Sequence, residues 1–415
     1  TTLSYDGDEL TEIRGIAGSF DLSWENGHII QVTDSAGRKT QYDYDEENLI
    51  SVTNPDGDTL QYSYDANGYL REAVDFNGDT TVQNTYDEQG RVTEQTFYNA
   101  GVPAHSDFTY DGTEGDLSIH TYTNSSGYTM SYYYDKYSQL VKTVDGDGNV
   151  TAFGYDQYLA GSLKDAQSNS VAYEFDDRGN VTKATYPDGA VVRYTYSTEN
   201  LVTSIAYEDG TEHYGYDGNG FLTSYTDKRG NTTYYGYENG VQTSVTDAAG
   251  NTTIYSYDAD ARLTAIFYPD GGETRYDRDA VGRITAVSVK IHDGETATTR
   301  YEYTDSGKLA KVTDAEGGVT AYEYDGNGFI TSTKDANGGI STTEYAINGQ
   351  PIRETDANGN VTSYSYNENG LLESVTDPEG NVTHRAYDPS RKLTSVTDAA
   401  GNETKYTYDS LDRLV

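Results

Sequence analysis

The stretch Gly380-Asn381-Val-Thr-His-Arg-Ala-Tyr387-Asp388-Pro-Ser-Arg-Lys-Leu393-Thr-Ser-Val396-Thr397-Asp398-Ala-Ala-Gly401-Asn402 contains the pattern that decides the fold. Two short runs rich in Thr, Val, Tyr and Leu alternate in it with two turn signals, Tyr-Asp-x-x-x and Asp-x-x-Gly-Asn. Asp at the start of a turn bonds nearby backbone amides, and Gly supplies positive φ at its end. The stretch therefore predicts a β-hairpin followed by a turn into the next strand.

This unit recurs along the chain. An aromatic residue, usually followed by Asp, returns at intervals of 19 to 27 residues, most often 20 or 21. These repeat aromatics are Tyr44, Tyr64, Tyr86, Tyr110, Tyr134, Tyr155, Phe175, Tyr196, Tyr216, Tyr237, Tyr257, Tyr276, Tyr303, Tyr324, Tyr345, Tyr366, Tyr387 and Tyr408. Self-similarity of this kind indicates a repeat protein in which each unit contacts mainly its neighbours. We expect an all-β fold with a tandem array over residues 40–415, preceded over residues 1–39 by degenerate repeats or a small cap.

Many units carry two tyrosines two residues apart, as in Tyr322/Tyr324 and Tyr364/Tyr366. Strand geometry places both rings on one face of the sheet, and stacking of the units would line the rings into ladders. Ser, Thr, Glu, Gln or Gly occupies the opposite positions, which suits a wetted face. The second strand of the unit, for example residues 371–376, does not alternate cleanly, so its facing stays open. No stretch keeps a helical period without an interrupting Gly, and we expect no long helix.

The composition alone would indicate disorder. The chain has 28 Lys and Arg against 68 Asp and Glu, a net charge of −40, and few branched aliphatic residues. High net charge with low aliphatic content is typical of disordered chains. However, the 42 Tyr residues are periodic, and each brings a large apolar area with one hydroxyl group. A single hairpin is not stable alone, whereas stacked hairpins supply the missing burial. We therefore expect a folded array with an aromatic core.

Several function classes are disfavoured. The absence of Cys excludes disulfides, thiol catalysis and Cys-based metal sites. A charge of −40 argues against nucleic acid as a partner, because that binding needs clustered Lys and Arg. No apolar run approaches the ~20 residues of a membrane helix, so we expect no membrane insertion. No secretory leader is visible, and the abrupt end at Val415 reads as a fragment boundary.

Metal and catalytic motifs are also weak. Asp145-Gly-Asp147-Gly-Asn149 resembles the start of a Ca²⁺ loop, but Val150 and Asp156 stand where the EF-hand loop has Gly and Glu. None of the six His residues is spaced as a ligand pair, and no nucleophile motif occurs. We expect no catalytic, cofactor or metal site. Ca²⁺ binding by the Asp-rich turns stays an open alternative to plain turns.

The unit Tyr-Asp-x-x-Gly-(Arg/Phe/Leu)-Leu-Thr-Ser-Val-Thr-Asp-x-x-Gly-Asn resembles the YD repeat of the Rhs family. That family includes bacterial polymorphic toxins, insecticidal toxin-complex shell proteins, wall-associated proteins and the teneurins. The best matches are Ala261-Arg262-Leu263-Thr264, Leu393-Thr-Ser-Val-Thr-Asp398 and Ser410-Leu-Asp412-Arg413-Leu414. The resemblance covers nearly the whole chain, most strongly residues 40–415. It implies a spiralling sheet of β-hairpins that curls into a hollow shell, which in the toxins encloses a C-terminal toxic polypeptide.

Two functions follow from the repeat and the resemblance. The first is a non-enzymatic shell segment of an exported bacterial protein, which encloses or presents a toxin polypeptide. The alternative is a cell-surface or secreted binding module that recognises glycan or protein through its aromatic-rich sheet. The expected partners are an enclosed or fused C-terminal polypeptide and, through the open ends of the sheet, further copies of the chain.

Overall fold

The computed structural model describes residues 2–15, 18–99, 102–156, 158–290 and 294–415. Within these ranges the chain forms 39 strands, and no helix there is long and apolar enough to cross a bilayer. The strands are β1 Thr2–Asp6, β2 Glu9–Gly15, β3 Gly18–Glu25, β4 His28–Asp34, β5 Lys39–Asp45, β6 Asn48–Thr53, β7 Thr59–Tyr64, β8 Leu70–Val74, β9 Thr80–Tyr86, β10 Val92–Asn99, β11 Val102–Glu114, β12 Leu117–Asn124, β13 Thr129–Tyr134, β14 Leu140–Val144, β15 Val150–Asp156, β16 Leu159–Lys164, β17 Ser170–Phe175, β18 Val181–Thr185, β19 Val191–Tyr196, β20 Val202–Tyr207, β21 Gly210–Tyr216, β22 Leu222–Thr226, β23 Thr232–Glu238, β24 Val241–Thr246, β25 Thr252–Tyr257, β26 Leu263–Phe267, β27 Glu273–Arg278, β28 Ile284–Lys290, β29 Thr296–Tyr303, β30 Leu309–Thr313, β31 Val319–Tyr324, β32 Ile330–Lys334, β33 Ile340–Tyr345, β34 Pro351–Thr355, β35 Val361–Tyr366, β36 Leu372–Thr376, β37 Val382–Tyr387, β38 Leu393–Thr397 and β39 Glu403–Lys405.

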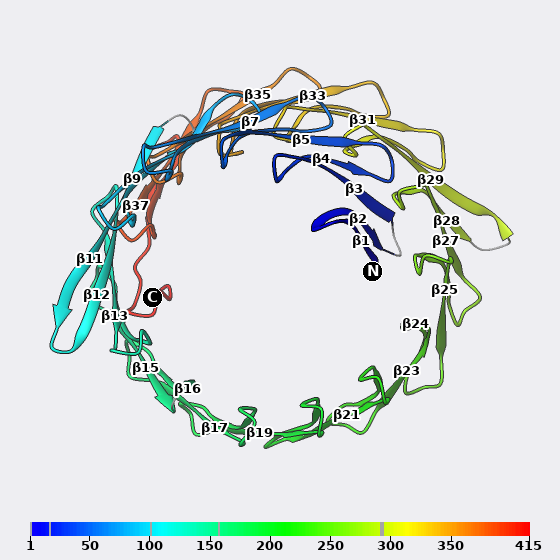
Figure 1. Ribbon diagram of the computed structural model, residues 1–415, viewed down its shortest axis with the longest axis horizontal. Helices are drawn as coiled ribbons and strands as arrows, with labels where there is room; N and C mark the ends of the chain where they lie inside the picture. Colours follow the sequence, from blue (N-terminus) through cyan, green and yellow to red (C-terminus); the bar gives the residue numbers. More distant parts are fainter. Residues whose placement is uncertain (1, 16–17, 100–101, 157, 291–293) are drawn as a thin grey trace.

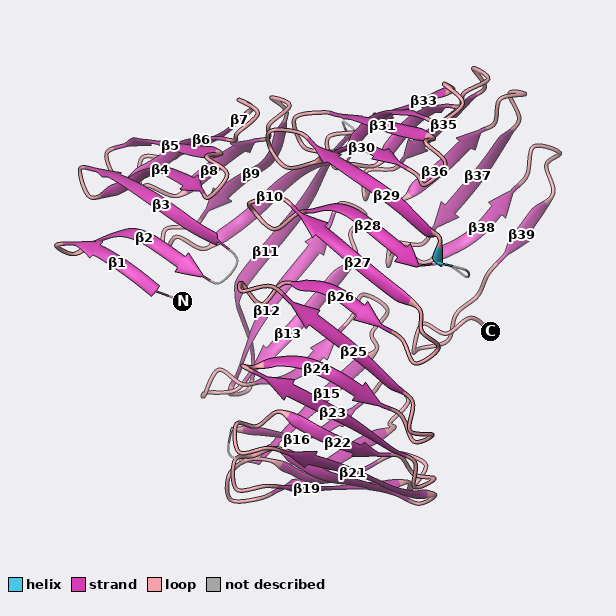
Figure 2. Cartoon of the chain, turned by 90° about the vertical axis from the view of Figure 1, so that its right-hand side faces the viewer, coloured by secondary structure: helices cyan, strands magenta, loops and turns pink. Residues whose placement is uncertain are grey.

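All of the strands belong to one antiparallel sheet in which each strand pairs with its neighbours in the sequence, from β1–β2 to β38–β39. Seen along the shortest axis, the sheet runs as a ring and then passes over its own beginning, so that β29–β37 overlie β3–β11 (Figure 1). The side view shows that the ribbon coils, with the N-terminal and C-terminal strands in separate layers (Figure 2). The expected all-β fold with a spiralling sheet of hairpins is confirmed.

Two kinds of turn form the two rims of this ribbon. Turns from odd to even strands, such as Asp325–Phe329, form the Tyr-Asp rim, and turns from even to odd strands, such as Asp314–Gly318, form the Gly-Asn rim. The five-residue turns of both kinds are closed in the same way: the first N–H donates to the fifth carbonyl, and the fourth N–H donates to the first carbonyl. The fourth residue has positive φ, +90° at Gly328, which explains the recurring Gly.

A β-bulge recurs at the Tyr-Asp rim. Tyr366 is paired with Leu372 and Ser365 with Ser374, so that Glu373 between them has no partner. The same shift occurs beside Tyr324 and beside most of the other repeat tyrosines, whereas nearly all ladders that end at the Gly-Asn rim are continuous. Bulges bend a strand and increase its twist. Repetition at one rim therefore accounts for the curl of the ribbon, and the extra residue explains why the second strand of the unit does not alternate cleanly.

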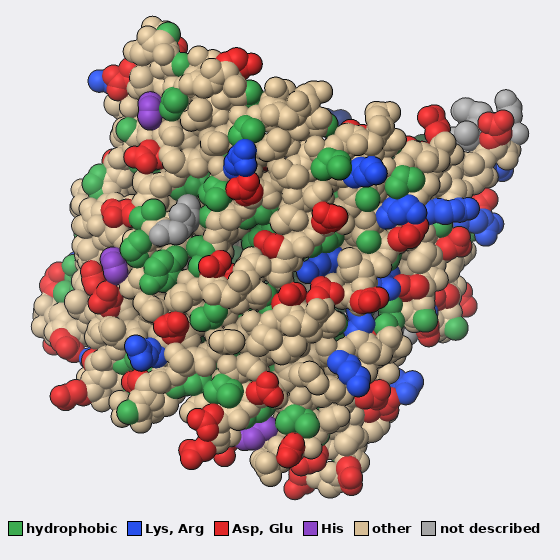
Figure 3. Space-filling view, turned by 90° about the horizontal axis from the view of Figure 1, so that it is seen from above, with side chains coloured by type: hydrophobic (Ala, Val, Ile, Leu, Met, Phe, Trp, Pro, Cys, Tyr) green, Lys and Arg blue, Asp and Glu red, His purple; other side chains and the backbone are tan. Residues whose placement is uncertain are grey.

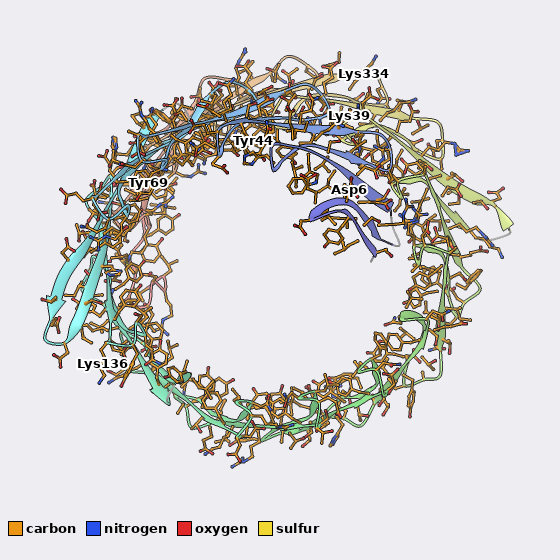
Figure 4. All side chains as sticks on the ribbon, in the orientation of Figure 1. Asp6, Lys39, Tyr44, Tyr69, Lys136 and Lys334 are labelled. Atoms are coloured by element: carbon orange, nitrogen blue, oxygen red, sulfur yellow. The ribbon has the colours of Figure 1, made fainter. Side chains whose placement is uncertain are left out.

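The two faces of the ribbon differ. In β5, Thr40, Tyr42 and Tyr44 are half-buried and the intervening residues are exposed. Figure 4 shows Tyr44 on the side of the wall that faces the centre of the ring, and Lys334 on the outer side. Residues that are paired across neighbouring strands lie on the same face of the sheet. The ladders therefore extend this assignment to the other strands, and the repeat tyrosines line the concave face.

The wall is one sheet thick, and the described residues form no closed core. Their buried apolar residues are mostly small, such as Ala104, Ala184 and Ala265, and no large side chain is fully buried. The expectation of an aromatic core is therefore corrected: the tyrosines cover one another laterally and remain half-buried. A single layer has nothing to pack against on its concave side, which is the physical reason.

The N-terminal residues continue the same sheet. Strand β1 pairs with β2, β2 with β3 and β3 with β4. Trp24 stands at a bulge like those of the later units, and its indole nitrogen donates to the carbonyl of Leu10 at 2.8 Å. The division at residue 39 into degenerate repeats or a cap and a regular array stays a prediction.

Candidate functional site: the tyrosine wall and the coil seam

The hydroxyl group of the repeat tyrosine links neighbouring units. The ladder between β30 and β31 has three residue pairs and ends at Lys311 and Ala321. Beyond it, toward the Tyr-Asp rim, the Tyr324 hydroxyl donates to the carbonyl oxygen of Leu309 at 2.6 Å. An unpaired backbone carbonyl in a half-buried position is costly. The tyrosine thus supplies the bond that the backbone no longer makes.

The residue after the turn glycine completes this link by covering the tyrosine ring. The rings of Phe329 and Tyr345 lie 5.2 Å apart, and those of Phe221 and Tyr237 5.0 Å apart. In other units a cation takes the aromatic's place, and the guanidinium carbon of Arg283 lies 4.7 Å from the Tyr303 ring centre. Aromatic pairs and cation–π contacts each stabilise by about 0.5–1.5 kcal/mol. In these units the aromatic or cationic residue at the variable position of the motif therefore covers the next repeat tyrosine.

Most of the expected repeat aromatics make this hydrogen bond. The donors are Tyr64, Tyr86, Tyr110, Tyr155, Tyr196, Tyr216, Tyr257, Tyr303, Tyr324, Tyr345, Tyr366, Tyr387 and Tyr408. Three others are held by ring contacts: Tyr44 with His28, Tyr134 with His120 and Tyr237 with Phe221. Phe175 is paired with Val181 beside a bulge and has no hydroxyl to donate. Tyr276 lies two residues before the bulge of its hairpin.

Arg278 takes the tyrosine's position in that hairpin. It is paired with Ile284 at the bulge, and its guanidinium donates to the carbonyl of Leu263 at 3.1 Å and to that of Gly282 at 2.9 Å. Leu263 is 15 residues earlier, the offset found for Tyr324 and Leu309. The sequence signal is Arg278-Asp279-Ala-Val-Gly282-Arg283, which matches the motif at every place but the first.

Charge is distributed unequally between the two faces. Outside the turns and bulges, the paired positions on the concave face of the described strands carry only four full charges, at Glu212, Glu354, Arg278 and Arg385. On the convex face, opposite charges stand directly across from one another, as in Glu302–Lys311 at 2.7 Å and Glu344–Arg353 at 2.8 Å. Seen from above, Asp and Glu side chains are spread over the surface and the turns (Figure 3). The concave wall is thus aromatic and nearly uncharged.

The two concave carboxylates each accept a tyrosine hydroxyl. Tyr364 donates to Glu354 at 2.6 Å, and Tyr214 donates to Glu212 at 2.9 Å. The hydrogen bond to Glu354, followed by burial, raises the pKa of Tyr364 to about 12. For Tyr214, burial and then Glu212 raise the pKa of the phenol. These tyrosines stay protonated well above neutral pH.

The turn aspartates on the rims are stabilised as carboxylates. In the turn Asp227–Asn231, Asp227 accepts the backbone N–H groups of Arg229 and Asn231, and the Asn231 amide donates to its second oxygen at 2.8 Å. The Asn side chain is the main cause of the lowered pKa of Asp227. At Asp176, the equivalent bond from Asn180 lowers the pKa to about 2. Much of the negative charge therefore belongs to turn geometry.

The same geometry accounts for the Ca²⁺-like stretch. Asp145 accepts the backbone N–H groups of Asp147 and Asn149, and Asp147 pairs with Lys392 at 3.0 Å. Within the described ranges, no three His, Asp or Glu side chains are grouped so that they could hold a metal ion.

A seam holds the coil where it overlies itself. Turns of the Gly-Asn rim between β4 and β17 touch turns of the Tyr-Asp rim between β29 and β38 and the turn that follows β39. The residues joined are 242 to 269 apart in sequence. The seam contacts are Arg38–Ser306, Asp56–Lys308, Asp75–Asn327, Phe76–Asn327, Asn77–Asp325, Asn77–Gly326, Asn99–Glu368, Asn99–Asn348, Asn124–Pro389, Ser126–Asn369, Asp147–Lys392, Gln167–Asp409 and Gln167–Arg413.

Most of the described five-residue turns begin with Asp; of the eight that do not, five lie at this seam, and the other three begin at Tyr186, Ser197 and Tyr268. Thr304, Ala346 and Asn367 begin turns of the Tyr-Asp rim there, and Asn54 and Asn124 begin turns of the Gly-Asn rim. Cations also cross the seam, as in Lys308–Asp56 and Lys392–Asp147. Because two acidic rims would repel one another, loss of carboxylates at the contact lowers the cost of bringing them together.

Two family models match the sequence. The model described as teneurin YD-shell matches residues 272–415, and the model described as RHS repeat matches residues 47–80, 175–212, 196–233 and 237–271. The matches together span nearly all of residues 175–415. The chain belongs to the Rhs/YD-repeat family. No curated protein matches the sequence significantly.

Solved structures share the fold of this Rhs/YD-repeat chain. The crystal structure of TcdB2-TccC3 superposes with a TM-score of 0.51 at 14% identity, over 96% of this chain and 30% of that chain. TcdB2-TccC3-Cdc42 gives a TM-score of 0.52 at 13% identity, over 96% and 32% of the two chains. TcdB2-TccC3-TEV gives 0.51 at 14%, over 98% and 33%. The present chain thus spans about a third of the length of those chains, and the likeness concerns the fold.

Proposed function

We propose that this chain is a non-enzymatic wall segment of a hollow shell, and that its concave tyrosine face contacts a polypeptide enclosed by that shell. The observation that carries the proposal is the unequal distribution of charge: the concave face is aromatic and nearly uncharged, the rims are acidic, and the convex face carries charged side chains of both signs. Membership of the Rhs/YD-repeat family and the fold shared with TcdB2-TccC3 support a shell-type segment.

The chemistry of the wall suits an unfolded or loosely folded polypeptide. Tyrosine offers an apolar ring and a hydroxyl that can donate or accept, so it contacts many side chains and exposed peptide groups without demanding one sequence. A wall with few charges also limits the number of ion pairs that a guest can form with it. The net charge of −40 on the other surfaces keeps a large shell soluble.

Binding of an unfolded polypeptide tests this proposal. The probe is a neutral, permanently unfolded polypeptide with a fluorescent label, and the readout is anisotropy at physiological salt. The test variant is Tyr173→Ser on the concave face, and the control is Tyr234→Ser on the convex face, where the side chains are 36% and 58% exposed. We expect the concave variant to weaken binding and the convex one to leave it unchanged. Equal effects from both, or no binding by the unaltered protein, would reject the proposal.

A glycan array separates the shell segment from a surface binding module. Tyrosine rings also stack on sugar rings, so the same wall could serve a secreted or cell-surface receptor. Saturable glycan binding that Tyr173→Ser abolishes, together with no affinity for the unfolded probe, would favour the receptor. We place the protein outside the cell in both cases, as an exported bacterial protein.

We also propose that the ends of the sheet pair with other chains. Strand β1 pairs only with β2 and β39 only with β38, so each leaves one row of backbone groups without a strand partner in the described part. Unpaired edges of this kind are templates for strand addition. Light scattering after size exclusion should show association that increases with protein concentration, and a monomer at all concentrations would contradict it.

A further inference from the structure

Glu354 stands on the concave face at a position that most other units fill with an aliphatic residue. It lies in β34 opposite Thr343 of β33 and Thr362 of β35. The equivalent position in other hairpins holds Val312, opposite Tyr301, and Val375, opposite Tyr364. A carboxylate here removes the apolar cover that the repeat normally provides. Apolar packing within the hairpin therefore gives no reason for its presence.

Among the described residues, Glu354 has a hydrogen-bond donor but no cationic partner. Its Oε2 accepts the hydroxyl of Tyr364 at 2.6 Å, and within the described residues it forms no ion pair. Two convex glutamates differ, because Glu344 is bound by Arg353 and Glu302 by Lys311. The Glu354 side chain is exposed toward the lumen and is oriented by Tyr364. The arrangement is an oriented negative charge on a neutral aromatic wall.

The wall already receives one ammonium group in similar surroundings. Nζ of Lys228 lies 3.5 Å from the ring centre of Tyr207 and 2.8 Å from the Oδ1 atom of Asp209. Glu212, held by Tyr214, lies close enough to Lys228 to raise the pKa of its ammonium, after the larger effect of Asp209. There, tyrosine faces and carboxylates bind a lysine of the chain itself. At Glu354 the tyrosine and the carboxylate are present and the described chain supplies no cation.

We propose that Glu354, oriented by Tyr364, binds the side-chain cation of a lysine or arginine of the polypeptide that occupies the concave side. The proposal rests on the proposed function, because it requires a polypeptide at this face. Charge-assisted hydrogen bonds are about twice as strong as neutral ones, and cations are attracted to tyrosine faces. A carboxylate that no cation of the described chain neutralises, on a wall with few charges, would thus set the register of a basic guest.

Paired probes test this assignment. The first is the neutral unfolded polypeptide with several lysines added, and the second is the same polypeptide after acetylation of those lysines. The test variant is Glu354→Gln, which keeps the shape of the side chain. The control is Glu323→Gln, an exposed carboxylate on the convex face of β31 opposite Ser332 that changes the net charge equally. Dissociation constants are measured by anisotropy at physiological salt.

The expected result separates local binding from general attraction. Glu354→Gln should raise the dissociation constant of the lysine probe about tenfold, equivalent to about 1.4 kcal/mol, and leave that of the acetylated probe unchanged. Glu323→Gln should leave both probes unchanged. An equal loss in both variants would show attraction by net charge alone, and an unchanged dissociation constant in Glu354→Gln would overturn the proposal. If the acetylated probe binds in either case, the proposed function stands independently.

Carbodiimide cross-linking supplies a second readout that does not depend on affinity. This reagent joins carboxylates to amines in direct contact, and peptide mass spectrometry locates the join. The lysine probe should be joined to Glu354 in preference to Glu323, and the Tyr364→Phe variant should reduce the yield at Glu354 because the carboxylate loses its orienting hydroxyl. Equal yields at Glu354 and Glu323 would overturn the assignment.

Discussion

The hydroxyl of Tyr324 lies 2.6 Å from the carbonyl oxygen of Leu309, and it joins two hairpin units where their backbone ladder has ended. Burial raises the pKa of this tyrosine, as it does for Tyr64 and Tyr257 at the same place in other units. The repeat tyrosine is therefore conserved in position through the array for a polar bond as well as for its ring. Four predictions follow from this link and from the seam.

Removal of the hydroxyl of Tyr324 should lower the stability of the protein, whereas removal of the hydroxyl of Tyr322 should not. Tyr324→Phe keeps the ring and leaves the Leu309 carbonyl unpaired, so we expect unfolding to become easier by about 1 kcal/mol. Tyr322→Phe is the control, since Tyr322 lies on the same face of the same strand and makes no hydrogen bond with the described residues. Urea unfolding followed by circular dichroism measures both. Equal midpoints for the two variants would show that the hydroxyl bond adds nothing.

Arg278 should be replaceable by tyrosine. Arg278→Tyr restores the residue found in most other units and should leave the thermal midpoint nearly unchanged. Arg278→Met keeps the length of the side chain but cannot donate to Leu263 or Gly282, and bonds from charged donors contribute about 1.5–3 kcal/mol each in favourable settings. Calorimetry compares the two. If Arg278→Met has the same thermal midpoint as Arg278→Tyr, the hydrogen bonds of the guanidinium do not contribute to stability.

The seam should open when Asn77 is truncated. Its side-chain oxygen accepts the N–H of Gly326 at 2.9 Å, and its amide donates to Asp325 at 3.2 Å. Asn77→Ala should speed hydrogen exchange at Gly326 and expand the coil in small-angle scattering. Asn337→Ala is the matched control, because Asn337 is also the third residue of a Gly-Asn turn but lies outside the seam. If both variants leave exchange at Gly326 unaltered, the two coils are held by other contacts.

Stability should fall at alkaline pH. The pKa values of Tyr64, Tyr196, Tyr216, Tyr257 and Tyr324 are raised by burial, and that of Tyr364 is raised to about 12. A tyrosine whose folded pKa exceeds its unfolded value of about 10 stabilises fully below pH 10, and this contribution is lost as pH rises through the folded pKa. The free energy of unfolding should therefore decline between about pH 10 and pH 12.

Tyrosinate absorbance and circular dichroism, recorded on the same samples, check this prediction. Ionisation and loss of strand signal should occur together in that range. If most tyrosines ionise near pH 10 while the strand signal persists, the hydroxyl bonds do not support the fold.

The features that local sequence could predict are those in which each unit repeats the same chemistry. The turn residues Asp, Gly and Asn indicated the hairpins, and the spacing of Tyr322 and Tyr324 indicated a shared tyrosine face. The bulge beside Tyr366 was not visible, because an unpaired Glu373 differs in no local way from a paired one. Arg278 was also missed, since Arg and Tyr are chemically different residues, although both donate to the carbonyl 15 residues earlier in the chain.

The sequence by itself determined that this protein is a tandem array of hairpins with one aromatic face, because turn chemistry and strand alternation depend on residues close together in the chain. Only the tertiary structure decided that the tyrosine face is concave, that Tyr364 orients Glu354 on it, and that Asn77 meets Asp325 across the seam. Curvature is the sum of small bends at many bulges, and the seam joins residues separated by a full coil. The curvature and the seam are both properties of the whole array, so the sequence of a single unit cannot predict either.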